Sequence, residues 1–287
     1  MYNSAMLRLK LLEPVDYLVI GHVTCDLIPG GHRVGGTASF AALTARALGL
    51  KVGVVTSTSV DLSLDLLDGI QVWNLPSDIS TTFENIYTPH GREQIIHAVA
   101  TNLDFYMVPE PWRQAPMVHL APVAQEVAPG LARHFPSSLV GLTPQGWLRG
   151  WKEDGRVYLA EWPEASFTLQ HAGAAVLSIE DVQGDEERIE EMAAYCKVLV
   201  VTEASQGARV FWNGDVRCFR PPTVVEVDAT GAGDVFSAAF FMRLYTTRDP
   251  WEAVRFANFL AARSVTRSGL DSIPTPSEVQ ESMVEVF

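Results

Sequence analysis

The sequence is poor in cysteine and has no long apolar run. Only three cysteines occur among 287 residues, and Cys25, Cys196 and Cys218 form no CxxC pair. This usage argues against a disulfide framework and a cysteine-based zinc site, and it is typical of a reducing cytoplasm. No stretch reaches the roughly 18 consecutive apolar residues of a membrane span, and residues 1–16 lack the apolar run of a signal peptide. We therefore expect a soluble, cytoplasmic protein.

Basic residues are also scarce. Lysine and arginine number 21 against 34 aspartate and glutamate residues, so the formal net charge is −13. This excess argues against duplex nucleic acid or an anionic membrane as a partner, because both require a dense basic patch. A local pocket for one phosphorylated small molecule stays compatible with it. Hydrophobic residues make up 47% of the chain and charged residues 19%, which is typical of a globular protein.

Short apolar runs alternate with helical patterns, which predicts an α/β fold. The apolar run 17–21 precedes a helix over 37–48 that stops before Gly49, and a second apolar run follows at 51–56. A strand, a helix and a strand within about forty residues imply a right-handed crossover and a parallel sheet. The other predicted elements are strands at 118–120, 139–142, 175–178 and 197–202, hairpins over 81–100 and 209–220, and helices at 184–195, 232–244 and 250–267. Without repeats or linkers, residues 1–287 are expected to form a single doubly wound domain, a mostly parallel sheet with helices on both faces.

The segment VDATGAGDVF, residues 227–236, carries the chemistry. A predicted strand over 224–227 ends at Asp228, and a Gly-Ala-Gly turn leads into an apolar helix. Backbone amides at such a helix start bind anions. Asp234 in the first helical turn is placed to accept a proton from an attacking hydroxyl, which predicts phosphoryl transfer to an alcohol. The alternative is an ordinary turn with an aspartate that only starts the helix. The sequence has neither a GxGxxG fingerprint nor a GxxxxGK[ST] motif.

This segment resembles the DTxGAGD signature of the ribokinase-like (PfkB-type) carbohydrate kinases. Other landmarks of that family follow in the same order: GHVTCD (21–26), GGTASFAALTARALG (35–49), VLVVTEASQGARVF (198–211) and RFANFLAARSVTRSGLDSIP (255–274). The resemblance extends from about residue 17 to residue 274. It implies a ribokinase-like fold with a small β lid, ATP and Mg²⁺ as co-substrate and ion, and K⁺ as a further candidate ion.

The resemblance also implies roles for matching residues. Asp234 corresponds to the catalytic base, and the amides of Gly231, Ala232 and Gly233 to the anion hole. The implied acceptor-site residues are Asp26, Gly35 and Gly36, and the implied nucleotide-site residues are Thr202, Gly207, Thr230 and Asn258. The positions that surround a monovalent cation in the family are Asp228, Thr230, Ser264, Gly269 and Ser272. The alternatives are a tight turn that needs Gly35 and Gly36 for backbone geometry alone, and ordinary loop capping at the cation positions.

Three positions depart from the family pattern. Phe40 stands where many members have a sugar-binding asparagine. The NxxE motif that organises water around magnesium ends in Asp181, which is shorter by one methylene. Ala204 replaces the first glycine of the TxGxxG nucleotide loop, so its backbone must suit a Cβ atom.

The acceptor side is predicted from weaker signals. A reduced lid is expected from about 27–34 and 81–100, with Phe83, Asn85 and Tyr87 facing the ligand or serving only as edge-strand residues. The segment LTPQGWLR resembles a VQxxxR pattern of the branch that includes plant myo-inositol kinase, which implies that Gln145 and Arg149 contact a polyol. Arg149 is alternatively a surface residue.

The predicted function is ATP-dependent phosphorylation of a hydroxyl of a small sugar, polyol or nucleoside. Two alternatives stay open: an inactive member that senses a sugar or nucleotide, and a dinucleotide-binding protein. The partners are the small acceptor and ATP, and the protein is expected to be a monomer or a homodimer.

Overall fold

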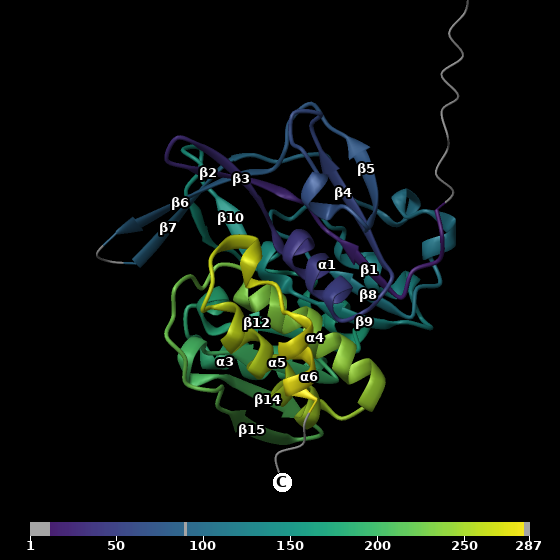
Figure 1. Ribbon diagram of the computed structural model, residues 1–287, viewed down its shortest axis with the longest axis vertical. Coiled ribbons are helices and arrows are strands. Elements are labelled where there is room, and N and C mark those ends of the chain that lie inside the picture. Colours follow the sequence, from purple (N-terminus) through teal and green to yellow (C-terminus); the bar gives the residue numbers. More distant parts are fainter. Residues whose placement is uncertain (1–11, 89–90, 284–287) are drawn as a thin grey trace, which may run out of the picture.

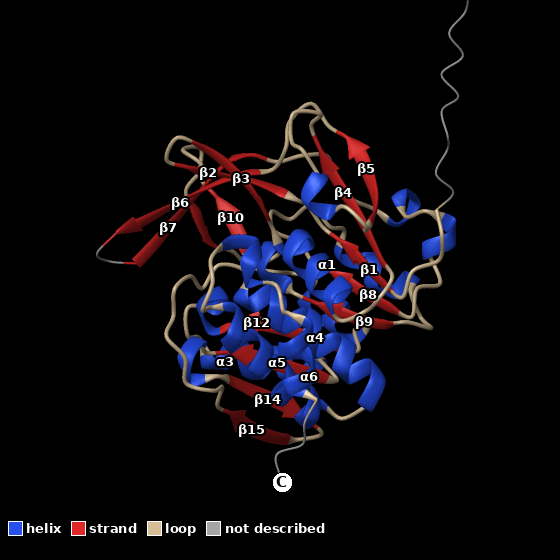
Figure 2. Ribbon diagram, viewed as in Figure 1, coloured by secondary structure: helices blue, strands red, loops and turns tan. Residues whose placement is uncertain are grey.

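The main sheet of the computed structural model runs through the whole molecule, and residues 12–88 and 91–283 are described. Its nine strands, in order across the sheet, are β15 (Asp215–Phe219), β14 (Ala208–Trp212), β13 (Val198–Thr202), β12 (Ala174–Ser178), β9 (Leu139–Leu142), β8 (Met117–Leu120), β1 (Tyr17–Ile20), β4 (Val52–Thr58) and β5 (Gln71–Pro76). Neighbours from β13 to β5 pair in parallel, and β14 and β15 form an antiparallel edge. The predicted doubly wound α/β fold is confirmed (Figures 1 and 2).

Successive strand residues point into two separate cores, which is why both faces of the sheet carry helices. Val19 and Val54 pack under α1, α4 and α5, whereas Leu18 and Val55 belong to the opposite core, to which α2 and α3 contribute. The helices are α1 (Thr37–Ala47), α2 (Ala165–Gln170), α3 (Glu186–Tyr195), α4 (Ala232–Thr247), α5 (Pro250–Ser264) and α6 (Pro276–Ser282). The short 3₁₀ segments are η1 (Asp65–Leu67), η2 (Phe105–Met107), η3 (Glu110–Trp112), η4 (Pro129–His134), η5 (Pro144–Gly146), η6 (Ile179–Val182), η7 (Ala204–Gln206) and η8 (Gly269–Ser272).

A four-stranded sheet forms the lid, beside the main sheet in Figure 1. Its order is β3 (Gly31–Gly35), β2 (Thr24–Ile28), β6 (Thr82–Thr88) and β7 (Gly91–Ala98). Two antiparallel hairpins are joined by a parallel pairing of β2 with β6. The predicted small β lid is confirmed, while residues 89–90, inside the predicted 81–100 hairpin, lie outside the described residues. A further hairpin, β10 (Arg149–Trp151) and β11 (Val157–Leu159), contacts β7.

One predicted strand is wrong. Residues 224–227 form no strand, and the amides of Val227 and Asp228 both donate to the carbonyl of Val265 at the end of α5, at 2.7 and 3.1 Å. An apolar run becomes a strand only beside a free sheet edge, and here the end of a helix supplies the acceptor instead. The elements β5, β10, β11, α2 and α6 were not predicted from the sequence.

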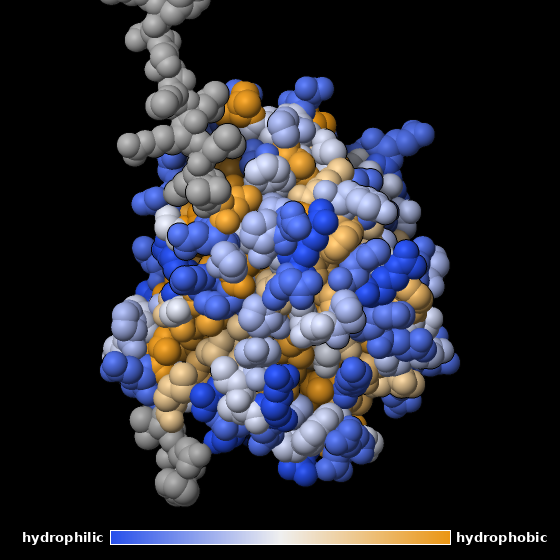
Figure 3. Space-filling model, turned by 90° about the vertical axis from the view of Figure 1, so that its right-hand side faces the viewer, coloured by the Kyte–Doolittle hydropathy of each residue, from blue (hydrophilic) through white to orange (hydrophobic). Residues whose placement is uncertain are grey.

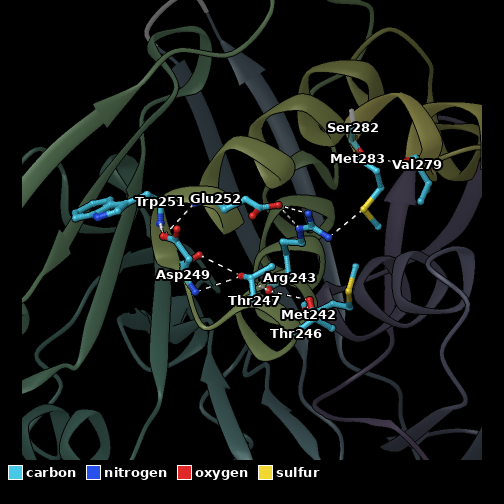
Figure 4. Close-up of polar contacts among 10 residues, drawn as sticks. All are labelled: Met242, Arg243, Thr246, Thr247, Asp249, Trp251, Glu252, Val279, Ser282 and Met283. Carbon is cyan, nitrogen blue, oxygen red and sulfur yellow. Dashed lines mark hydrogen bonds and ion pairs between the residues drawn. The ribbon is translucent and has the colours of Figure 1, made fainter. Parts of the chain in front are cut away.

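The turn between α4 and α5 is tightly bonded (Figure 4). Asp249 caps α5 by accepting from the amides of Trp251 and Glu252, as the Asp-Pro pair predicts. The Arg243 guanidinium pairs with Glu252 and donates from Nη1 to Met283 Sδ at 3.0 Å. These bonds fix α4, whose other end carries the Gly-Ala-Gly turn.

No helix in the described ranges is long and apolar enough to cross a membrane. Hydrophilic and hydrophobic side chains are interspersed on the face shown in Figure 3.

Candidate active site

Gly231 begins α4 in a left-handed conformation. Its φ is +80°, and a methyl group added there would lie 2.4 Å from Cδ1 of Phe40. Both facts require glycine at this position. By contrast, a methyl group at Gly233 would meet no described atom within 4 Å, so this turn faces open space. The Ala232 amide already donates to the Ala229 carbonyl at 3.2 Å, so an anion at that amide must share or replace this bond.

Asp234 lies in the same turn, partly exposed and close to three other charged groups. Burial among the surrounding atoms raises the pKa of Asp234 to about 6, and the charges of Asp181 and Asp26 act in the same direction. A hydrogen bond from the Thr37 side chain and the charge of Arg149 oppose this shift without cancelling it. The result is a carboxyl group that changes protonation state just below neutral pH.

Asp26 projects from β2 toward the start of α1. The Thr24 hydroxyl donates to Asp26 Oδ1 at 2.8 Å, and a methyl group on Gly35 would lie 2.3 Å from Oδ2. Gly36 has a φ of +86°, and a methyl group there would lie 2.6 Å from the His22 carbonyl oxygen. Backbone geometry therefore requires glycine at position 36, in agreement with the tight-turn alternative, whereas at Gly35 an added methyl group would meet only the Asp26 side chain.

Arg149 is held in place at the start of β10. Its Nη1 donates to the Val123 carbonyl at 3.0 Å, and its guanidinium carbon lies 5.5 Å from the ring centroid of Phe83. Its charge also acts on Asp234, so this arginine lies close to the predicted base. Contact of Arg149 with an acceptor stays a prediction. Arg33, which is paired with Asp26 across β2 and β3, is a second cation here, and its charge acts on Asp228.

Gln145 and Asp181 form one unit. Gln145 Nε2 donates to Asp181 Oδ1 at 3.0 Å, and the Ser178 amide donates to Asp181 Oδ2 at 2.9 Å. Gln145, which is predicted to contact the acceptor, thus donates to Asp181, which is predicted to order magnesium-bound water. Gln145 as an acceptor ligand stays a prediction.

Two aromatic residues predicted for the acceptor side, Phe40 and Phe83, are buried. Phe40 is 4% exposed and stands behind Gly231, and Phe83 is 3% exposed beneath Arg149. Asn85 accepts from Gln94 Nε2 at 3.1 Å across β6 and β7, as an ordinary strand residue does. The Tyr87 side chain lies outside what the structure describes.

Three of the predicted nucleotide-site residues, Thr202, Gly207 and Asn258, lie near the ends of β13 and β15. A methyl group on Gly207 would lie 2.0 Å from the carbonyl oxygen of Phe219, and Asn258 Nδ2 donates to that same oxygen at 2.8 Å. Thr202 donates from Oγ1 to the Leu177 carbonyl at 3.4 Å. Ala204 has a φ of +49°, a region that alanine rarely occupies.

The predicted cation positions meet where the loop before α4 approaches η8. Asp228 accepts from the Thr230 amide at 2.9 Å and from the Gly269 amide at 3.4 Å. Burial by itself raises the pKa of Asp228, but these hydrogen bonds and the charge of Arg33 hold it below its usual value. Ser264 donates to the Ala261 carbonyl, whereas the buried Ser272 hydroxyl has no hydrogen-bond partner among the residues that the structure describes. Within the described ranges, no three His, Cys, Asp or Glu side chains gather closely enough to hold a metal ion.

Residues 161–277 match the pfkB family of carbohydrate kinases. The chain is 27% identical over 267 residues to the cytidine kinase of Thermococcus kodakarensis, an alignment that covers 84% of this chain and 92% of the relative. It is 43% identical to the ribokinase of Bacillus subtilis over 94 residues, which cover 32% of each chain. A solved pyrophosphate-dependent kinase of the ribokinase family, complexed with a pyrophosphate analogue and myo-inositol, superposes with a TM-score of 0.78 at 21% identity, covering 93% of this chain and all of that chain.

The match over residues 161–277, the named relatives and the structural neighbours together support a ribokinase-like, pfkB-type carbohydrate kinase. The protein is accordingly a kinase, and kinases of the ribokinase family use ATP and generally need Mg²⁺. The family match at 161–277 contains the turn before α4, Asp228 and the end of β13. The residues around Asp26, Phe83 and Arg149 lie outside it.

Some residues of the site could not be found from the sequence. Thr37 directly follows the Gly-Gly pair, but nothing in the sequence connects it with Asp234. Glu126 is a lone glutamate after an apolar strand, and it is 1% exposed in the folded chain.

Proposed function

We propose that this pfkB-family kinase transfers the γ-phosphoryl group of ATP to a hydroxyl of a small sugar, polyol or nucleoside, with Asp234 as the general base. The observation that carries this proposal is the raised pKa of Asp234, to about 6, beside a helix start that opens at Gly233. A base with a pKa near the working pH is both ionised and basic enough to take a proton from an alcohol.

The proposed sequence of events uses this chain's own groups. Asp26 accepts hydrogen bonds from the acceptor and orients its hydroxyl toward Asp234. An Asp234 carboxylate oxygen takes the hydroxyl proton as the new O–P bond forms and the bond to the departing diphosphate breaks. The amides of Gly231 and Gly233 and the positive end of α4 stabilise the charge on the transferring group. The lid excludes water, which would otherwise compete as the acceptor.

The ions are assigned by the chemistry of the available donors. Asp181 would hold Mg²⁺ through water, because its two oxygens are oriented by Gln145 and Ser178 and keep further lone pairs. Bound there, the ion would neutralise charge on the phosphates. The buried Ser272 hydroxyl without a partner, beside the Asp228 loop, fits an oxygen ligand of a monovalent cation such as K⁺.

The acceptor class is tested by a panel. Purified protein is incubated with Mg²⁺ and either ATP or pyrophosphate, together with cytidine and other nucleosides, inositols, ribose or fructose. The named relatives motivate this choice of acceptors and donors. We expect acceptor-stimulated ADP release with ATP. Binding of ATP and acceptor without turnover would support the sensor alternative instead.

The Asp234→Asn variant tests the base. We expect the rate to fall by roughly 10²–10⁴ with little change in ATP binding. Asp215→Asn, on the exposed edge strand β15, is the matched control and should keep full activity. Full phosphotransfer by Asp234→Asn would overturn the assignment.

A further inference from the structure

Glu126 is a buried carboxylate held by backbone amides. Its side chain is 1% exposed, and Oε1 accepts from the His22 amide at 3.0 Å. The Val123 amide reaches both carboxylate oxygens at 3.1 and 3.0 Å, and the Ala124 amide donates to Oε2 at 2.7 Å. Several N–H donors offset the high cost of burying a charge, so a carboxylate with two acceptor oxygens suits this position.

One of the two loops joined by Glu126 leads to Asp26. His22 lies between β1 and β2, and its carbonyl packs against Gly36 at the start of α1. The backbone then runs through Thr24, whose hydroxyl donates to Asp26. The position of the His22 backbone therefore sets the position of the carboxylate proposed to bind the acceptor.

The other loop supports Arg149. The carbonyl of Val123 accepts from Arg149 Nη1 at 3.0 Å, and the Gln125 side chain donates to the Arg149 carbonyl. Glu126 fixes this loop through the amides of Val123 and Ala124. Glu126 thereby fixes the position of Arg149, whose positive charge lowers the pKa of Asp234.

The His22 side chain also contacts the two chain segments at the base of the lid. His22 Nε2 faces the Thr101 carbonyl at 2.9 Å and therefore donates to it, and His22 Nδ1 lies 2.6 Å from the Thr81 hydroxyl. The Thr81 hydroxyl also accepts from the Ala100 amide at 2.9 Å. The chain enters β6 just after Thr81 and leaves β7 just before Ala100.

We propose that Glu126 is a positioning residue of the acceptor site, which holds the Asp26 loop, the Arg149 loop and the base of the lid in one arrangement. The proposal rests on the proposed function for its effect on turnover. The joining of the two loops by Glu126 does not depend on the proposed function. The donor half of the site, around Asp228, is not connected to this junction by any of these bonds.

The test compares Glu126→Gln with Glu126→Asp and Tyr17→Phe. The glutamine variant keeps the shape but offers one acceptor oxygen, and its NH₂ group faces amide donors. The aspartate variant keeps the charge on a shorter side chain. Tyr17→Phe removes a buried hydrogen bond to His119 at the opposite end of β1, so it controls for a general loss of stability.

Two measurements separate positioning from stability. Hydrogen–deuterium exchange of the peptides covering 21–26 and 121–126 should quicken about tenfold in Glu126→Gln and not in Tyr17→Phe. The acceptor kcat/KM should fall about 10- to 100-fold while the ATP KM stays within about twofold, because misplaced groups affect only the acceptor. Glu126→Asp should recover part of the loss.

The two proposals fail separately. If the wild type turns over no acceptor, the proposed function fails, while exchange in the two loops still decides the role of Glu126. If Glu126→Gln is too unstable to purify, Glu126→Asp gives the same measurements with a smaller change. Unaltered exchange in both loops, or equal losses for acceptor and ATP, would overturn the positioning role.

Discussion

The ring of Phe40 packs against the α-carbon of Gly231, and a methyl group on that carbon would lie 2.4 Å from Phe40 Cδ1. An aromatic residue from the first helix thus supports the turn that begins α4. Many family members have a sugar-binding asparagine at this position, whereas here the buried Phe40 ring packs behind the proposed anion site.

Two glycines of this turn are expected to respond differently to alanine. Gly231→Ala combines a left-handed φ with the clash against Phe40, so we expect a loss of about 2–4 kcal/mol in unfolding free energy. Urea denaturation measures this loss. In the double variant Phe40→Ala/Gly231→Ala the ring is absent, so the clash is relieved. Its loss in unfolding free energy should therefore be smaller than the sum of the losses of the two single variants.

Gly233→Ala should leave the fold intact and impair turnover. A methyl group there meets no described protein atom, and alanine favours the helix by up to about 1 kcal/mol. The same methyl group occupies the space in which a phosphoryl group would approach the turn. We expect unchanged or higher stability with a clear fall in kcat, and wild-type turnover would show that the donor binds elsewhere.

The pH dependence of turnover is expected to follow Asp234. The group must be deprotonated to act as a base, so kcat/KM should fall as the pH drops through about 6. Thr37→Val removes a hydrogen bond that lowers this pKa and should move the acidic limb to higher pH. Thr37→Ser keeps the hydroxyl and should leave the limb in place. If the acidic limb stays at the same pH in Thr37→Val, the limb belongs to a titrating group other than Asp234.

His119 should make the protein less stable in acid. The ring is fully buried between Tyr17 and Thr143, and burial lowers the pKa of His119 to about 3. The unfolded chain, with a pKa of about 6.5, binds more protons between these values, so stability falls as the pH drops below about 6.5. We expect this histidine to account for about 2 kcal/mol between pH 7 and pH 5. Urea denaturation of His119→Gln should show a correspondingly flatter pH dependence, despite lower stability at pH 7.

Ala204→Gly should stabilise the nucleotide loop. Alanine at a φ of +49° costs about 1 kcal/mol, which glycine does not pay. Thermal unfolding should therefore occur at a higher temperature. Ala193→Gly, inside α3, is the contrasting control and should cost about 1 kcal/mol. A destabilised Ala204→Gly variant would mean that the loop adopts another conformation in solution.

Local signals predicted most of the fold, because they concern neighbours along the chain. The hairpin predicted over 209–220 turns at Asn213 and Gly214, both of which have a positive φ, +52° and +81°. The 224–227 run failed as a strand, since only the three-dimensional arrangement decides whether a sheet edge is free. The start of α4 and Asp234 were recognised from a short motif. The contacts of Thr37 and Glu126 join segments far apart in sequence, which no motif in the chain records.

The family match at 161–277 coincides with the part of the chain that carries Asp228, Asp234 and the end of β13. The groups proposed to recognise the acceptor come from β2, the lid and β10, all earlier in the chain. Under the proposed function, recognition of the phosphate donor and recognition of the alcohol fall to two consecutive stretches of sequence. Evolution can alter the earlier stretch, and with it the choice of alcohol, while the later one keeps its chemistry, as expected in a family whose named members act on nucleosides, sugars and inositol.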